Sequence, residues 1–185
     1  MPRSNRAWPE VPDTPRRPIL IALAIAVFTT VGVWLVVGPR DGGAGRATKD
    51  GPAPAIVGTT LDGAAFDLAA YAGQPVIVNF WGPSCVPCRD EFPLFIAKLA
   101  EHADDALAIV GVLTDDPPEP ARRFVADLGA TWPTVQDPDK ALKTAYRVAG
   151  RPQTYFIDGA GIIRSIQIGE IRDADFERQY AKIAP

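Results

Sequence analysis

Residues 76–92 read VIVNFWGPSCVPCRDEF and contain the only two cysteines of the chain, Cys85 and Cys88. A β-branched apolar run precedes the pair and a helical pattern follows it, which predicts a strand that ends beside a helix start. Cys85 would lie at the helix N-terminus, where unpaired N–H groups and the helix dipole favour a thiolate. Cys88 would lie one turn inside, close enough to attack a mixed disulfide formed at Cys85. The spacing predicts a redox-active dithiol.

Two other interpretations of the cysteine pair are weaker. A structural zinc site needs about four ligands, and the only further Cys or His residue of the chain is His102. We expect His102 to be an exposed residue near a helix end. A purely structural disulfide would normally close a longer loop, because a two-residue loop constrains the unfolded chain little. Redox chemistry is therefore preferred, with no metal and no cofactor expected.

The N-terminal part of the 185-residue chain differs in character from the rest. Residues 19–37 carry no charge. As a helix they would be about 28 Å long, close to the roughly 30 Å hydrocarbon core of a bilayer. We predict a cytoplasmic tail at 1–18, a transmembrane anchor at 19–37, a flexible linker at 38–54 and a folded domain at 55–185. A cleaved signal peptide is the alternative, although no small-residue cleavage site follows the apolar run.

Charge gives a weak indication of orientation. Basic residues lie on both sides of the apolar segment with a slight excess before it, so the positive-inside rule leans toward a cytoplasmic N-terminus. The dithiol domain is then expected on the extracytoplasmic side of the cell membrane. Residues 51–185 are acidic overall, and nothing in that balance indicates a nucleic-acid surface.

Hydrophobic periodicity predicts the elements of the folded domain. They are a hairpin at 55–66, buried strands at 76–81 and 107–113, a helix after Cys85 with Phe92, Phe95, Ile96 and Leu99 on its inner face, a helix at 120–129, a short helix after 138, a hairpin at 154–157 and 162–168, and a terminal helix capped by Asp173. Two strands joined by a crossover helix are parallel, and the closing hairpin is antiparallel. The order therefore predicts an α/β fold with a mixed sheet.

The chain resembles the thioredoxin superfamily at residues 79–93, which read NFWGPSCVPCRDEFP. The similarity runs from about Pro54 to the C-terminus, and it is greatest to the membrane-anchored branch typified by TlpA, ResA and CcmG. The resemblance implies a thioredoxin-like fold, with a mixed sheet flanked by helices and an N-terminal hairpin. The helix from about Pro120 and the strand after it correspond to the central insertion of the TlpA-like branch.

The resemblance also implies roles for three further residues. Pro152, in the run Gly150 to Thr154, matches the cis-proline that faces the dithiol. Trp81 looks like the tryptophan beside the active site, with packing under the loop as the alternative. Glu91 matches an acidic position of CcmG-like members and could accept the proton of Cys88. The alternative for Glu91 is a solvated surface carboxylate paired with a basic neighbour, Arg89 or Lys98.

The resemblance implies a reductant that keeps the haem-site cysteines of apocytochrome c reduced, with protein disulfides as substrates and a membrane electron donor. A disulfide-forming oxidase of secreted proteins is the main alternative. A peroxiredoxin is remote, because the Pro-x-x-x-Thr-x-x-Cys signature is absent around Cys85. A copper carrier is equally remote, because the cysteine spacing differs and no His follows His102. Asp115 and Asp116 are interpreted as acids that cap the following helix.

Overall fold

A computed structural model describes residues 46–185, which form a five-stranded sheet and a separate two-stranded hairpin. The strands are β1 (Val57–Thr59), β2 (Ala65–Asp67), β3 (Val76–Trp81), β4 (Ala108–Leu113), β5 (Thr134–Gln136), β6 (Gln153–Ile157) and β7 (Ile163–Ile168). The α-helices are α2 (Val86–Glu101), α3 (Pro118–Leu128), α4 (Ala141–Ala145) and α5 (Asp173–Tyr180), and the 3-10 helices are η1 (Leu68–Tyr71) and η2 (Ala103–Asp105).

The five-stranded sheet is mixed and has the order β5-β4-β3-β6-β7. β4 runs parallel to both β3 and β5, whereas β6 is antiparallel to β3 and to β7. α2 provides the crossover between β3 and β4, which parallel neighbours require. Because β6 opposes β3 in direction, the start of β6 lies at the same edge of the sheet as the ends of β3 and β4.

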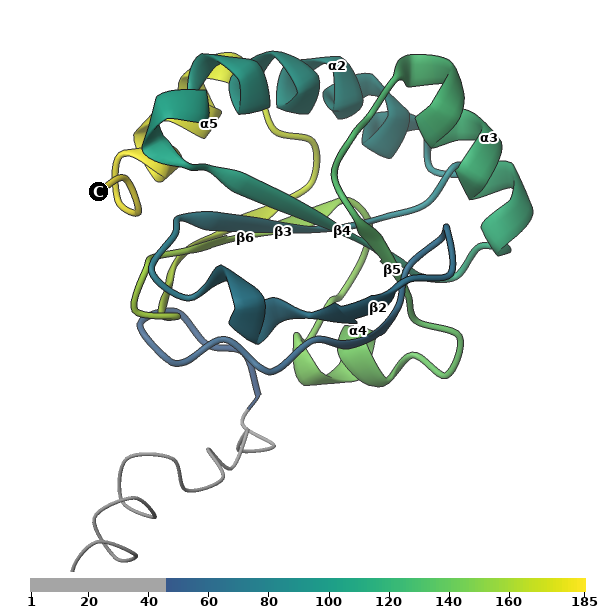
Figure 1. Ribbon diagram of the computed structural model, residues 1–185, viewed down its shortest axis with the longest axis horizontal. Coiled ribbons are helices and arrows are strands. Elements are labelled where there is room, and N and C mark those ends of the chain that lie inside the picture. The colour runs from purple at the N-terminus through teal and green to yellow at the C-terminus, as the bar shows by residue number, and fades with distance from the viewer. Residues whose placement is uncertain (1–45) are drawn as a thin grey trace, which may run out of the picture. The chain divides into compact units, whose positions relative to one another are not determined.

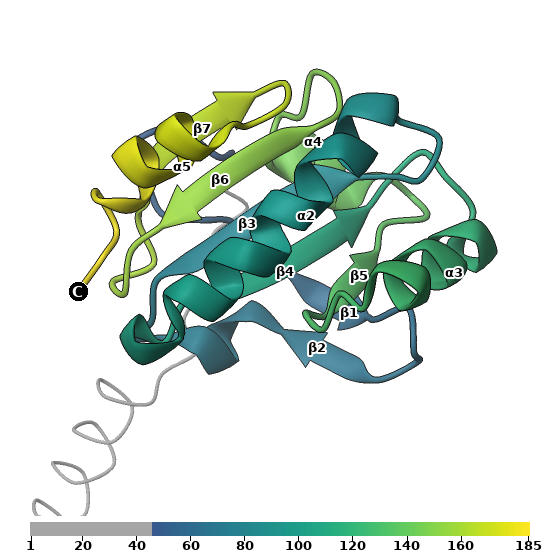
Figure 2. The same ribbon diagram turned by 90° about the horizontal axis from the view of Figure 1, so that it is seen from above.

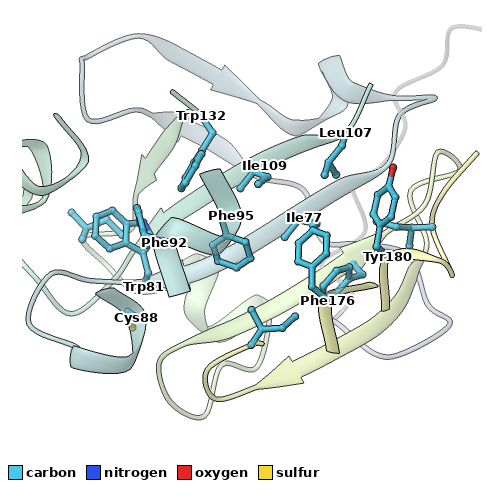
Figure 3. Close-up of a cluster of buried hydrophobic side chains, with 14 of the residues drawn as sticks. Ile77, Trp81, Cys88, Phe92, Phe95, Leu107, Ile109, Trp132, Phe176 and Tyr180 are labelled. Atoms are coloured by element: carbon cyan, nitrogen blue, oxygen red, sulfur yellow. The ribbon is translucent and has the colours of Figure 1, made fainter. Parts of the chain in front are cut away.

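Helices cover both faces of the sheet. α2, α3 and α5 lie on one face, and α4 and the β1–β2 hairpin lie on the other (Figures 1 and 2). Figure 3 shows the cluster under α2, where Phe92 and Phe95 lie with Phe176 of α5 over Ile77 and Ile109 of the sheet. Both α2 phenylalanines are fully buried, as their spacing predicted. Burying each side chain contributes about 1.5–3 kcal/mol, so this face holds α2 firmly on β3.

The packed domain begins earlier than the sequence indicated. The predicted linker reached residue 54, but Ala47 is buried and its N–H donates to the carbonyl of Ala145 at 2.9 Å. Asp50 N–H donates to the carbonyl of Ile163 at 2.7 Å. These backbone pairs tie the stretch to α4 and β7, so it is not a free tether from Ala47 onward.

The predicted tail at 1–18 and the anchor at 19–37 lie outside the residues that the structure describes. Within residues 46–185, no helix combines the length and the apolar character that crossing a membrane requires.

Two expectations about the end of α2 and the start of α5 are wrong. Asp173 is the first residue of α5, and no side-chain hydrogen bond caps that helix. Its carboxylate instead contacts Lys98 Nζ at 2.8 Å, because the nearly buried ammonium of Lys98 needs anionic partners. His102 is half-buried instead of exposed, and its ring lies 4.0 Å from the ring of Tyr180. These contacts join the end of α2 to α5.

Candidate active site

Cys85 and Cys88 form a disulfide at the start of α2, with Cα atoms 5.2 Å apart. Cys85 is the N-cap of the helix, and its Sγ accepts the N–H of Cys88 at 3.3 Å. Pro87 lies in the first turn, where its fixed φ suits a helix start and its missing N–H costs nothing. Cys85 is partly exposed, whereas Cys88 is fully buried. The helix start therefore exposes the Cys85 sulfur and favours its thiolate form once the disulfide is reduced.

The buried carboxyl group of Glu91 lies in α2, about one helix turn after Cys88. Glu91 Oε1 accepts from Asn79 Nδ2 at 2.8 Å, and Oε2 accepts the N–H of Ile171 at 3.1 Å. Asn79 also donates to Thr154 Oγ1 at 3.0 Å. Burial raises the pKa of Glu91 from 4.5 to about 8, although both hydrogen bonds favour the carboxylate. Because Glu91 follows Cys88 by three residues, the two side chains share one face of α2.

The surface interpretation of Glu91 does not hold in the structure. Its side chain is 1% exposed, so it is not a solvated carboxylate. The ammonium of Lys98 pairs with Glu101, Asp173 and Glu177 instead, and the guanidinium of Arg89 lies 5.5 Å from the ring of Phe124.

Trp81 lies in the same buried cluster as Cys88 (Figure 3). It ends β3 directly before residues 82–85, which form the active-site turn between β3 and α2. Its ring centroid is 4.6 Å from that of Phe92 and 5.6 Å from that of Phe124. The indole is fully buried, so its contacts in the structure are those of packing under the loop.

The loop before β6 lies against the turn before Cys85. The Arg151–Pro152 peptide bond in this loop is cis. Arg151 Nη1 donates to Asp116 Oδ2 at 2.8 Å, and the same oxygen accepts the N–H and the hydroxyl of Ser84 at 3.1 and 2.8 Å. Ser84 directly precedes Cys85, so folding brings Pro152 to the dithiol end of α2.

Sequence reasoning missed Asp116 and Arg151 as residues of this site. It interpreted the acidic pair as a helix cap, but α3 has no side-chain cap. Asp115 instead pairs with Lys140 at 2.8 Å and with Lys143 at 2.5 Å. A signal was present in the predicted topology. Asp116 follows β4 and Arg151 precedes β6, and those two ends lie at one edge of the sheet, so their opposite charges were candidates for pairing.

One cluster with metal-ligand chemistry occurs among residues 46–185. Ligand atoms of Glu101, His102 and Glu177 lie within 4.8 Å of one another. The ammonium of Lys98 contacts both glutamates, so the cluster already contains a positive charge. It lies at the far end of α2 from the disulfide and takes no part in the cysteine chemistry.

Comparison with known proteins agrees with this geometry. Residues 50–166 match the AhpC/TSA family. The chain belongs to that family. The thiol–disulfide oxidoreductase ResA of Geobacillus kaustophilus is 32% identical over 133 residues, which are 72% of this chain and 76% of ResA.

Two solved structures extend the comparison. A thioredoxin-family thiol:disulfide interchange protein of Chlorobium tepidum is 26% identical with a TM-score of 0.67, over 74% of this chain and 98% of that one. A secreted Mycobacterium tuberculosis disulfide oxidoreductase, described as homologous to E. coli DsbE, is 25% identical with a TM-score of 0.62, over 68% and 94% of the two chains.

These similarities confirm the predicted thioredoxin-like α/β fold and the resemblance to the ResA branch. The Cys85–Cys88 disulfide has the Cys-x-x-Cys spacing expected of that chemistry. The protein is a thiol–disulfide oxidoreductase.

Proposed function

We propose that this oxidoreductase reduces protein disulfides on the extracytoplasmic side of the cell membrane, with the haem-site cysteines of apocytochrome c as its substrate class. The observation that carries the proposal is the buried carboxyl of Glu91, on the same helix face as the buried Cys88. With its pKa raised to about 8, this carboxyl is a stronger base than an ordinary carboxylate, and its ionised fraction, which grows as the pH rises toward 8, can take a proton from a buried thiol. Such a base serves the step in which a substrate is released in reduced form.

The reaction transfers two electrons to the substrate. The thiolate of Cys85 attacks one sulfur of the substrate disulfide, forms a mixed disulfide, and releases the other substrate sulfur, which takes up a proton. Glu91 then accepts the proton of Cys88. The Cys88 sulfur attacks Cys85, the mixed disulfide breaks, and the second substrate thiol leaves with a proton. The protein is left with the Cys85–Cys88 disulfide.

Two further residues have supporting roles in this proposal. Pro152 has no N–H, so it presents no donor to a substrate strand that approaches the dithiol. Trp81 supports the active-site turn from below by its packing on Phe92. The disulfide that each turnover produces requires two electrons from outside the chain, for which we propose a membrane electron donor.

The charges around Cys85 favour a reductant over an oxidase. Val86 and Pro87 carry no charge between the cysteines, and Asp116 neutralises the guanidinium of Arg151. The thiolate therefore gains moderate stabilisation, mainly from the helix start, and a moderately stabilised thiolate gives a reducing couple.

The direction of electron flow is tested by the redox potential of the full-length protein in detergent. We expect the potential to lie nearer the thioredoxin value of about −270 mV than the DsbA value of about −120 mV. Paired rate assays should show faster reduction of a Cys-x-x-Cys-His peptide disulfide than oxidation of a reduced secreted protein. A potential near the DsbA value, with fast disulfide formation, would establish the oxidase alternative.

The membrane anchor at residues 19–37 is the second part of the proposal. Its uncharged length matches a bilayer core. A relative from Mycobacterium tuberculosis is described as secreted, which supports the extracytoplasmic side and not the anchor itself. We expect the protein to stay with membranes after a carbonate wash and to have its full-length mass. Recovery of a soluble form that starts between residues 38 and 47 would show cleavage of a signal peptide instead.

A further inference from the structure

An ion pair between Asp116 and Arg151 joins the loop that follows β4 to the loop that precedes β6. The side chains of Asp116 and Arg151 are 9% and 16% exposed, so the pair is largely shielded from water. Arg151 Nη1 also donates to the carbonyl of Thr114 at 2.7 Å, and Nη2 lies 3.5 Å from Ser84 Oγ. The guanidinium is therefore held in one place, beside the residue that precedes Cys85.

The backbone of the active-site turn leaves room for this pair. A Cβ atom added to Gly82 would clash with Arg151 Nη1 and with Asp116 Oδ2. Gly82 lies in the turn between β3 and α2, so the ion pair is seated directly on the chain that leads to Cys85. Only a residue without a side chain permits that approach.

The charge of Asp116 is maintained by its neighbours. Burial acts to raise the pKa of Asp116, but hydrogen bonds from Ser84 and Arg151 outweigh it and lower the pKa. The carboxylate is therefore ionised at neutral pH and cancels the charge of Arg151. A guanidinium next to a cysteine would otherwise favour the thiolate and so stabilise the reduced form of the couple.

We propose that Asp116 is a positioning residue that keeps the Cys85–Cys88 couple reducing, because it cancels the charge that Arg151 places beside Ser84, the residue next to Cys85. The inference rests on the proposed role of Cys85 as the attacking thiolate.

Arg151 Nε also lies 4.0 Å from Asp115 Oδ2, but Asp115 already pairs with Lys140 and Lys143. Without Asp116, the guanidinium would therefore keep most of its charge, stabilise the dithiol form and make the couple more oxidising. Without Arg151, the unpaired carboxylate would destabilise the thiolate and make the couple more reducing.

The test is equilibration of the full-length protein with glutathione. Two glutathione thiols reduce the Cys85–Cys88 disulfide and form one glutathione disulfide, and the two protons pass to the protein thiols. Asp116→Asn should raise the equilibrium constant for reduction of the protein about fivefold, and Arg151→Gln should lower it about fivefold. The variant that combines Asp116→Asn with Arg151→Gln should remain within about twofold of the unmodified protein. Arg151→Lys keeps the cation and should also remain within about twofold.

Asp158→Asn is the matched control, because Asp158 also accepts backbone N–H bonds and pairs with Arg164, but in the β6–β7 turn. It should leave the equilibrium constant unchanged. A merely structural role would move both single variants in the same direction, and that result, or no shift in either, would overturn the inference. The glutathione equilibrium uses no protein substrate. Opposite shifts without reduction of a Cys-x-x-Cys-His peptide would therefore contradict only the proposed function.

Discussion

Cys88→Ser should hold substrates as mixed disulfides, whereas Cys85→Ser should hold none. Cys85 is partly exposed at the start of α2, where its Sγ accepts the N–H of Cys88. It is therefore the sulfur that a substrate can reach, and Cys88 is the sulfur that resolves the complex. Incubation with an oxidised Cys-x-x-Cys-His peptide, followed by non-reducing mass spectrometry, measures the trapped adduct. We expect all of the trapped adduct on Cys88→Ser and none on Cys85→Ser.

The double variant, in which both cysteines are serine, is the control for non-covalent retention of the peptide. It should give no adduct. Equal amounts of adduct on the two single variants would contradict the assignment of roles within the pair, although not the presence of the disulfide.

Glu91→Gln should slow the resolution of the mixed disulfide about 100-fold near pH 7.5, because the variant lacks a base for the Cys88 proton. Loss of a positioned general base has effects of this size. The measurement is the rate of peptide release from a preformed mixed disulfide, followed as a function of pH. Asp90→Asn removes the adjacent, exposed carboxylate of α2 and should leave the rate unchanged. A Glu91→Gln rate equal to that of the unmodified protein would remove Glu91 from the mechanism.

The same variant should change how stability depends on pH in the oxidised protein. The folded state raises the pKa of Glu91 from 4.5 to about 8, so it binds the proton more tightly than the unfolded state. Stability is therefore greatest below the unfolded pKa and is lost as pH rises through the folded one. Between pH 5 and pH 9, Glu91→Gln should gain about 4 kcal/mol of unfolding free energy relative to the unmodified protein. Urea unfolding at several pH values measures this difference. If the unfolding free energies of the two proteins changed with pH in parallel, the raised pKa of Glu91 would be contradicted.

Local patterns in the sequence were enough for the elements and for the chemistry. The strand Val76–Trp81, the helix after Cys85 and the closing hairpin all occur where periodicity placed them. The spacing of Cys85 and Cys88 indicated the redox pair without any tertiary information. These features depend on neighbours within about one helix turn or one strand, and such neighbours are visible in a sequence.

The surroundings of the dithiol depended on contacts between distant segments. Glu91 is buried because Asn79 of β3 and the N–H of Ile171 enclose it, and its helix position alone also fitted an exposed carboxylate. The sequence position of Asp116 indicated a helix cap, whereas in the structure its carboxylate accepts from Ser84 and Arg151. Burial and the charges of remote residues set a pKa. Both arise only when β3, β4 and β6 meet at one edge of the sheet, so the tertiary structure alone assigns these carboxylates their places.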